Sequence, residues 1–283
     1  MSQEISVDAL IPQEMAEKAE AIGVRKAGLS FWPLFSLSVL AGAFIGLGAM
    51  FATTTAAGSS ALPYGVARLL IGLTFCIGLI LVVVGGAELF TGNNLIVMAW
   101  ASRKVSTGAL LRNWAIVYLG NFVGSLGTAA LVFFSKQYTF GSGSVGEAAL
   151  KIAASKIHYG FIQAMALGIL CNGLVCLAIW LTYSARSAAD KILAIVFPIT
   201  AFVAASFEHS VANMYFVPYA LFIKAFDPAF VTGLADKAPE LSSLTWGTFF
   251  LKNLLPVTIG NIIGGSGLVA LMYWFIYLRG RKN

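Results

Sequence analysis

Long apolar stretches separated by charged residues dominate the chain. Six such stretches hold almost no charge of their own. Their bounding residues are Lys26 and Arg68, Arg68 and Arg103, Arg112 and Lys136, Lys156 and Arg186, Lys191 and Lys224, and Lys252 and Arg279. A helix that crosses a bilayer needs about 20 predominantly apolar residues. The pattern therefore predicts an all-α, polytopic membrane protein with six transmembrane helices.

Two of the six stretches, Leu69–Ser102 and Ile192–Ile223, are too long for one span and too short for two. A straight helix of either length would extend about 50 Å, whereas the hydrocarbon core of a bilayer is about 30 Å thick. Polar residues lie in the middle of both, in GGAELFTGNN at 85–94 and in SFEHSVANM at 206–214. Non-helical backbone survives at that depth only where protein buries it or a water-filled path reaches it. We therefore expect spans two and five to be broken.

The chain also repeats itself. Residues 113–131 and 253–271 share a frame of Asn, Gly, Asn, Gly, Gly, Ala and Leu at a constant offset, with glycines that we interpret as packing surfaces. Glu88 and Glu208 each precede an asparagine by the same spacing in the two breaks. The first and fourth stretches match weakly, through Phe35 and Gly42 against Phe161 and Gly168. Three spans in each half would insert the second half upside down, so we predict inverted repeats over about 31–140 and 150–280.

Composition agrees with a membrane location. Hydrophobic residues make up 59% of the chain and charged residues 11%, whereas a soluble domain has about 25% charged residues. This excludes a soluble enzyme and a nucleic-acid binder. The distribution of lysine and arginine favours both termini in the cytoplasm, which predicts a multi-pass protein of the cell (inner or plasma) membrane and accounts for the net charge of +6. No spacing of ligands indicates a metal site, and no cofactor motif is present.

His209 is the sharpest candidate for chemistry, because it is the only histidine in the middle of an apolar stretch. Ionisable groups inside a membrane are costly and are usually functional. A neutral imidazole can donate or accept a hydrogen bond, and it titrates near neutrality. We therefore expect His209 to hydrogen-bond a permeating anion or to donate a proton to it, and the alternative is a buried histidine bonded only for structure.

The breaks contain further polar residues. We interpret the carboxylates of Glu88 and Glu208 as caps for unpaired backbone N–H groups of the half-helices that follow, in preference to a carboxylate relay for substrate. The positive ends of those half-helices favour an anionic or polar solute. Asn121 and Asn261 either line the path or bond neighbouring helices to each other, and the sequence leaves both interpretations open.

The residues before the first span form a separate segment. Pro12 followed by QEMAEKAEAIGVRK predicts a short amphipathic helix, with Pro12 in its first turn and Arg25 and Lys26 near its end. We therefore divide the chain into an N-terminal cytoplasmic helix at 1–30 and a six-span channel domain at 31–283. The N-terminal helix either lies on the membrane surface or acts as a movable plug or a partner contact.

Four motifs carry a resemblance to a known family: GAELFTG at 86–92, LGILCN at 167–172, FVAASFEHSVANM at 202–214 and NLLPVTIGNIIGG at 253–265. On these motifs the chain resembles the formate/nitrite transporter family, most closely its formate channels, over nearly its whole length. The resemblance implies an aquaporin-like fold and a homopentamer in the lipid bilayer with one pore in each protomer. It also implies passage of formate or a similar small monovalent anion, or of its acid, with a pH dependence.

The resemblance further implies two apolar constrictions. Phe75 and Phe202 correspond to the outer one. Leu79, which we assign to the loop that breaks segment two, and Phe90 correspond to the inner one, with Val175 nearby.

It also implies a polar centre between the constrictions. Thr91 corresponds to a threonine that faces the central histidine, His209. Lys156 and Asn172 correspond to a buried polar pair linked to that centre, and Glu208 to its neighbour. Asn261 corresponds to an asparagine near the pore.

One feature departs from the expected pattern. The residues after Thr91 are Gly92, Asn93 and Asn94, a run that is not expected in a formate channel. Other functions also remain open. A channel for nitrite or hydrosulfide would share most pore-lining residues. A water or glycerol channel of the aquaporin type is disfavoured because the breaks lack an Asn-Pro-Ala pair. A membrane enzyme is disfavoured because no nucleophile–base pair or metal set is present.

Overall fold

The structure, a computed structural model, describes residues 9–280, and every regular element in that range is helical. The first eight residues of the predicted 1–30 segment lie outside the described residues. The elements of the first half are α1 (Pro12–Ala27), α2 (Phe31–Ala56), η1 (Ser59–Ala61), α3 (Tyr64–Gly85), α4 (Phe90–Asn93), η2 (Asn94–Ile96), α5 (Val97–Ala101), α6 (Thr107–Phe134) and η3 (Gln137–Thr139). Those of the second half are α7 (Ser144–Ile157), α8 (Phe161–Ser184), α9 (Ala188–Ala204), α10 (Ser210–Phe226), α11 (Pro228–Gly233), η4 (Ala235–Lys237), α12 (Trp246–Thr248), η5 (Phe249–Leu254), α13 (Leu255–Ile262), η6 (Ile263–Leu271) and α14 (Met272–Tyr277).

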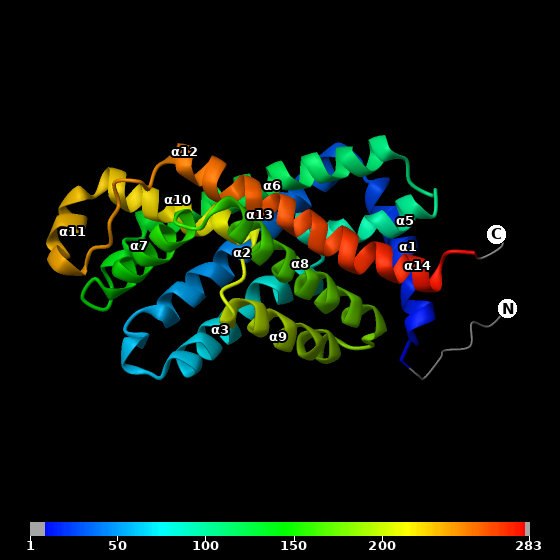
Figure 1. Ribbon diagram of the computed structural model, residues 1–283, viewed down its shortest axis with the longest axis horizontal. Coiled ribbons are helices and arrows are strands. Elements are labelled where there is room, and N and C mark those ends of the chain that lie inside the picture. Colours follow the sequence, from blue (N-terminus) through cyan, green and yellow to red (C-terminus); the bar gives the residue numbers. More distant parts are fainter. Residues whose placement is uncertain (1–8, 281–283) are drawn as a thin grey trace.

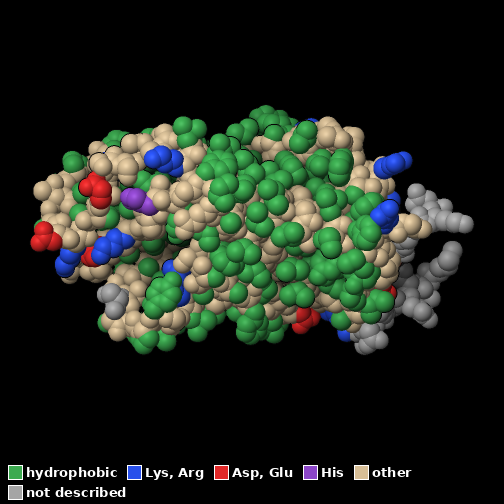
Figure 2. All heavy atoms as spheres, viewed as in Figure 1, with side chains coloured by type: hydrophobic (Ala, Val, Ile, Leu, Met, Phe, Trp, Pro, Cys, Tyr) green, Lys and Arg blue, Asp and Glu red, His purple; other side chains and the backbone are tan. Residues whose placement is uncertain are grey.

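The predicted apolar stretches are helical. Within residues 9–280, five helices are long and apolar enough to cross a bilayer: α2, α3, α6, α8 and the continuous run from α12 to α14, in which η5 and η6 are π-helical. The fifth stretch is divided between α9 and α10, which have 17 residues each. Together with an apolar surface across the middle of the molecule and charged side chains toward its two ends (Figure 2), this arrangement is that of a multi-pass membrane protein.

Both long stretches are interrupted at the predicted motifs. Helix α3 ends at Gly85 and α4 begins at Phe90, while α9 ends at Ala204 and α10 begins at Ser210. The interruptions are shorter than the motifs, because the chain becomes helical again within each motif. The placement of Leu79 in the breaking loop is wrong, since Leu79 lies inside α3. The helix continues past Leu79 through the apolar residues 80–84, and it stops only where Gly86 takes a left-handed φ of 80°.

Glycines bring two pairs of helices into close contact. A Cβ atom at Gly120 of α6 would collide with the Ser38 side chain, and one at Gly124 with the backbone of α2. One at Gly260 or Gly264 would collide with the backbone of α8. Close backbone approach at small residues is the usual way that helices pack in a membrane. Gly127 and Gly267 were predicted to be packing surfaces as well, but both face open space.

Helix α7 is an element that the sequence interpretation did not predict, because it lies between two of the predicted apolar stretches. Its apolar side, with Val145, Leu150 and Ile157 among its buried residues, packs mainly on α10. Helices α7 and α11 lie at one end of the elongated molecule, and α1 and α14 lie at the other (Figure 1). The predicted N-terminal helix is confirmed as α1, and it packs on α5 and η2.

Candidate functional site

Both breaks end their first helix at a residue with left-handed backbone. At the second break the Ser206 N–H donates to the Val203 carbonyl and the Phe207 N–H to the Phe202 carbonyl, both at 3.0 Å. This is a Schellman motif, which requires a left-handed residue, and Ser206 takes that role with φ 59°. At the first break Gly86 takes it.

After each break, an asparagine from a neighbouring helix holds the start of the new half-helix. Asn121 Oδ1 accepts from the Phe90 N–H at 2.9 Å, and Asn261 Oδ1 accepts from the Ser210 N–H at 2.9 Å. Their Nδ2 groups donate to carbonyls on both sides: Asn121 to Ser38 and Glu88, and Asn261 to Gly168 and Glu208. Both asparagines are fully buried. The side-chain amides of both asparagines are thus bonded to backbone groups. This agrees with the interpretation that they bond neighbouring helices to each other.

These contacts also correct the weak alignment of the first and fourth stretches. The Glu88 N–H donates to the Leu37 carbonyl, and the Glu208 N–H donates to the Leu167 carbonyl. Ser38 therefore corresponds to Gly168, whereas the sequence interpretation had paired Gly42 with Gly168.

The glutamates do not cap the backbone, so that interpretation is wrong. Glu88 accepts from Asn93 Nδ2 at 2.7 Å and forms an ion pair with Lys26 Nζ at 3.0 Å. Among the described residues, no backbone N–H donates to either carboxylate. A carboxylate buried in a membrane protein needs a cation more than it needs an amide, and the lysine at the end of α1 supplies one.

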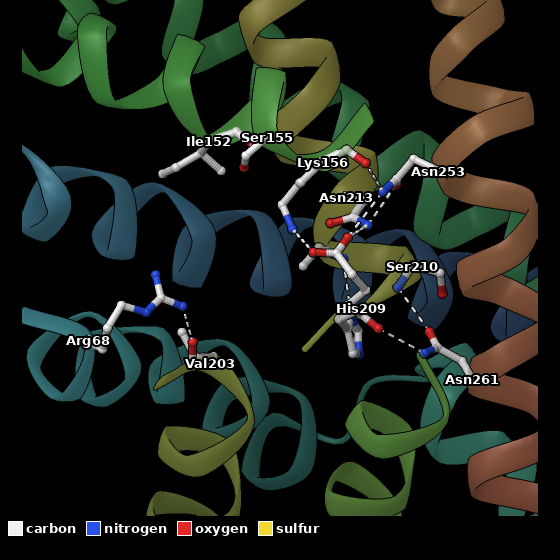
Figure 3. A network of polar contacts seen from close by, with 12 residues as sticks. Arg68, Ile152, Ser155, Lys156, Val203, His209, Ser210, Asn213, Asn253 and Asn261 are labelled. Atoms are coloured by element: carbon white, nitrogen blue, oxygen red, sulfur yellow. Dashed lines mark hydrogen bonds and ion pairs between the residues drawn. The ribbon is translucent and has the colours of Figure 1, made fainter. Parts of the chain in front are cut away.

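Glu208 has the corresponding partners. It accepts from Asn213 Nδ2 at 2.7 Å and from Lys156 Nζ at 2.8 Å, and Lys156 lies in the last turn of α7 (Figure 3). Asn253 accepts from Asn213 and donates to the Lys156 carbonyl. Asn113 joins the first set in the same two ways. The sequence interpretation missed Lys26, Asn113 and Asn253 as members of these networks. Lys26 precedes α2 by the same spacing as Lys156 precedes α8, and this match is a signal that could have found Lys26.

His209 is the N-terminal cap of α10. Its Nδ1 accepts from the Ala212 N–H at 3.1 Å, and its Nε2 lies 3.0 Å from Thr91 Oγ1. Because a backbone N–H can only donate, Nδ1 is unprotonated, and the neutral ring carries its proton on Nε2 toward Thr91. His209 is 3% exposed and Thr91 is fully buried. The predicted facing pair is therefore present as a geometry.

The phenylalanines of the expected outer constriction are in contact. The rings of Phe75 and Phe202 meet edge to face with centroids 5.7 Å apart, and the Phe202 ring stacks on His209 at 5.9 Å. Phe90 instead packs edge to face against Tyr118 of α6 at 4.9 Å. Leu79, Phe90 and Val175 are all buried.

Asn172 does not pair with Lys156, which corrects the expected polar pair. Among the described contacts, Lys156 bonds Glu208, whereas Asn172 Nδ2 donates to the Asn261 carbonyl at 2.7 Å, to Asn94 Oδ1 at 2.9 Å and to the Thr91 carbonyl at 3.3 Å. Asn172 thus links the first half-helix to Asn261 of α13.

The unexpected Gly92-Asn93-Asn94 run is absorbed into these contacts. Asn93 Oδ1 accepts from Lys26 Nζ at 2.9 Å, and Asn94 bonds Asn172 and the Phe90 carbonyl. Both asparagines are fully buried. A Cβ atom at Gly92 would meet the end of the Ile179 side chain of α8, which would have to move to admit it.

Two cavities flank this centre. The α1 cavity, about 250 Å³, is lined by Lys18, Arg25, Lys26, Glu88, Asn93 and Lys191 among others. The α7 cavity, about 120 Å³, is lined by Arg68, Phe75, Lys156, Phe202, Glu208 and His209 among others. The two cavities share no lining residue. Thr91, Leu79, Phe90, Val175, Asn172 and Asn261 line neither of them.

Lysines and an arginine outnumber the acidic groups around the α1 cavity. Glu88 is paired with Lys26, whereas Lys18 donates to the Tyr183 carbonyl at 2.7 Å. The pKa of Lys18 lies below its ordinary value, because burial removes water from the ammonium and Lys191 adds a like charge. Each cavity thus presents positive charge beside a buried glutamate–lysine pair.

The sequence of the chain matches the model of the family described as formate/nitrite transporter over residues 13–275. The chain belongs to the formate/nitrite transporter family. It is 46% identical over 273 residues to the formate channel FocA of Escherichia coli strain K12, covering 96% of each chain. It is 40% identical to the formate channel FocA of Haemophilus influenzae, covering 94% of each.

A solved structure of this family has the same fold. A pentameric formate channel with formate bound superposes with a TM-score of 0.83 at 44% identity, covering 88% of this chain and 98% of that one. The chain is thus an all-helical, multi-pass membrane member of a transporter family.

Proposed function

We propose that the protein is a channel for formate, which crosses as the anion or as its acid. The observation that carries this proposal is the buried Thr91–His209 pair, which lies beside the Phe75–Phe202 contact in a chain 46% identical to a formate channel. An apolar contact of this kind opposes a bare anion, because desolvating a charge is costly. It opposes the neutral acid far less.

The charges beside the centre fit this route. Lys156 lines the α7 cavity and Lys26 lines the α1 cavity. Because Glu88 and Glu208 neutralise these two lysines, the net positive charge that attracts an anion comes from Arg68 in the α7 cavity and from Lys18 and Lys191 in the α1 cavity. Burial then favours protonation of that anion, because burial disfavours its charged form. Leu79, Phe90 and Val175 would narrow the path on the α1 side, and Asn172 and Asn261 would hold the backbone around it.

The geometry of His209 favours hydrogen-bond donation over proton donation. Protonating Nδ1 would set its new N–H against the Ala212 N–H and break the cap of α10. The ring therefore serves the path through Nε2–H, which now faces Thr91 Oγ1 and can turn to a passing oxygen. The proton that accompanies formate would come from water in the cavity.

The assembly and topology follow the family resemblance. We propose a homopentamer in the inner membrane with one path in each protomer, built from six spans as two inverted repeats and with both termini cytoplasmic. The matched contacts of Asn121 with Asn261 and of Glu88 with Glu208 support the repeat.

The test is anion flux into liposomes that contain only this protein, with internal pH recorded. Formate, nitrite and hydrosulfide are offered in turn at two pH values. We expect strong formate flux with acidification of the interior, because each formate that enters brings a proton with it. Preference for nitrite or hydrosulfide would replace the substrate and keep the route.

Variants of His209 separate its two candidate roles. His209→Asn keeps an oxygen to accept from the Ala212 N–H and an N–H to donate toward Thr91, but it cannot titrate. We expect it to conduct formate with the wild-type pH dependence over pH 5–8, because in the proposed role the side chain donates a hydrogen bond and not a proton, whereas His209→Phe abolishes flux. If His209→Asn is as inactive as His209→Phe, the ring is a proton donor. His158→Phe, at the other histidine, is the matched control.

A further inference from the structure

Arg68 joins the two helices that carry the constriction phenylalanines. It lies in the first turns of α3, and its guanidinium donates to the carbonyls of Val203 and Ala204 at the end of α9 (Figure 3). Phe75 lies two turns along α3 from Arg68, and Phe202 directly precedes Val203. One side chain therefore spans from the helix of one phenylalanine to the backbone beside the other.

The Arg68 contacts continue a tight seam between α3 and α9. One turn along α3, a Cβ atom at Gly72 would collide with the Thr200 backbone. One further turn along, Cys76 Sγ lies 3.3 Å from Thr200 Oγ1. These α3 residues recur at helical spacing on one face, so the seam fixes how the two helices lie against each other.

Arg68 also supplies hydrogen bonds that the second break lacks. The last four carbonyls of a helix have no partner within it. The Schellman motif satisfies those of Phe202 and Val203, and among the described residues only Arg68 is recorded as a donor to the Ala204 carbonyl. A guanidinium suits this place because its planar fork can donate to two carbonyls at once.

The two halves of the chain differ at this point in a correlated way. Counted by the offset that relates Glu88 to Glu208, Ser206 corresponds to Gly86, and Arg68 corresponds to Ala188. The first break thus has Gly86 at its left-handed residue and Ala188 at the position of the supporting side chain. The second break has Ser206 and Arg68 at the corresponding positions. A left-handed φ is free of strain for glycine but costs serine about 1 kcal/mol. The arginine stands where the backbone needs support.

We propose that Arg68 is a positioning and specificity-determining residue, which clamps the end of α9 to α3 and so sets the Phe75–Phe202 contact and the backbone that leads to His209. This rests on the proposed formate path. Without the clamp, the last turn of α9 loosens and the phenylalanines separate, so the path admits a bulkier monocarboxylate.

Selectivity tests the clamp in the liposome assay. Acetate carries one more methyl group than formate, and one such group at a tight apolar contact is worth about ten-fold in discrimination. We expect Arg68→Ala to raise the acetate-to-formate flux ratio by up to about ten-fold. Arg112→Ala is the matched control, because Arg112 also donates to a backbone carbonyl, that of Leu29, away from the constriction.

Arg68→Lys distinguishes a clamp from a charge that merely attracts anions. Lysine keeps the charge but loses the two-pronged fork. The clamp predicts that Arg68→Lys shifts the flux ratio toward that of Arg68→Ala. The clamp would be overturned if Arg68→Lys kept the wild-type acetate-to-formate flux ratio and Arg68→Ala lowered formate flux without changing that ratio. Ser206→Gly in the Arg68→Ala background should restore part of the selectivity, because it removes the strain at the left-handed residue.

Hydrogen exchange tests the clamp without any substrate. In Arg68→Ala the amides of Ser206 and Phe207 should exchange faster by about ten-fold or more, as expected on losing a hydrogen bond to a charged group. The amides of Gly86 and Ala87 at the other break should be unchanged. Unchanged exchange at both breaks overturns the clamp even if wild-type protein conducts formate. Absence of formate flux in wild-type protein overturns the proposed function and leaves the exchange result to decide the clamp.

Discussion

The polar networks at the two breaks contain the same residue types, but their hydrogen bonds are satisfied to different extents. In the first, Lys26 Nζ contacts both Glu88 and Asn93 Oδ1. In the second, Lys156 contacts Glu208, while Asn213 Oδ1 is buried without a hydrogen-bond partner. The Lys156 side chain is 12% exposed and that of Lys26 is 23% exposed. The second network is thus the more buried and the less satisfied.

The comparison has a functional meaning. An unpaired buried acceptor costs free energy unless something donates to it, and Asn213 and His209 both line the α7 cavity. The less satisfied network therefore lies beside the histidine, whereas the fully bonded one lies under α1. The polar groups of the first network are bonded to one another, whereas the second network keeps a polar atom, Asn213 Oδ1, that can bond a solute in the α7 cavity.

The largest expected effect comes from removing the buried acids. Glu208→Gln leaves Lys156 buried without a counter-charge, which should destabilise the protein by about 3–5 kcal/mol. Glu88→Gln should cost less, because Lys26 keeps Asn93 and is more exposed. Thermal unfolding of the purified protein in detergent measures both. Lys156→Met added to Glu208→Gln should recover much of the loss, and equal losses in the two single variants would contradict the comparison.

Next come the asparagines that hold the half-helices. Asn121→Ala and Asn261→Ala each remove the acceptor of one half-helix N–H and the side-chain donor to the Glu88 or Glu208 carbonyl, at a cost of about 3 kcal/mol. We expect similar falls in thermal stability, because the two sets of bonds match. Formate flux per folded protein should fall far more in Asn261→Ala, since Ser210 follows His209 directly. Equal losses of flux would show that the second break has no special place on the path.

The unpaired acceptor gives a smaller contrast. Asn93→Ala removes a bond to a lysine that Asn213→Ala does not, so it should be more destabilising by about 1.5 kcal/mol. Unfolding in detergent again measures the difference. A larger loss in Asn213→Ala would mean that an ordered donor already occupies its oxygen.

The smallest effect concerns the contact between η3 and the start of α11, where Asp227 accepts from the Tyr138 hydroxyl at 2.6 Å. The bond from Tyr138, followed by that from the Phe230 N–H, holds the pKa of Asp227 below its ordinary value. A lowered carboxyl pKa adds stability above the unfolded value near 4, and this stability is lost as the pH falls through the folded value. Asp227→Asn should therefore lower the unfolding temperature slightly at pH 7 and leave it unchanged near pH 2. An equal decrease at both pH values would exclude this ionisation as the cause.

Sequence reasoning located both breaks because their polar residues interrupt apolar stretches that are too long for one span. It found the Asn121 and Asn261 repeat because a constant offset is visible without coordinates. It failed on α7, whose short amphipathic pattern lies between charged residues, and on Leu79, because apolar residues do not reveal where a helix stops. The stop depends on the left-handed residue that follows.

The sequence by itself determined the helical class, the apolar stretches, the paired breaks and His209 as the residue to test, because hydrophobicity, spacing and residue type are local properties. The tertiary structure alone decided which groups are partners. Lys26 and Lys156 lie far from Glu88 and Glu208 along the chain, and Arg68 is more than a hundred residues from the carbonyls it binds. Such pairings arise only when helices cross, because a buried carboxylate or carbonyl bonds to the nearest donor in space, whatever its distance along the chain.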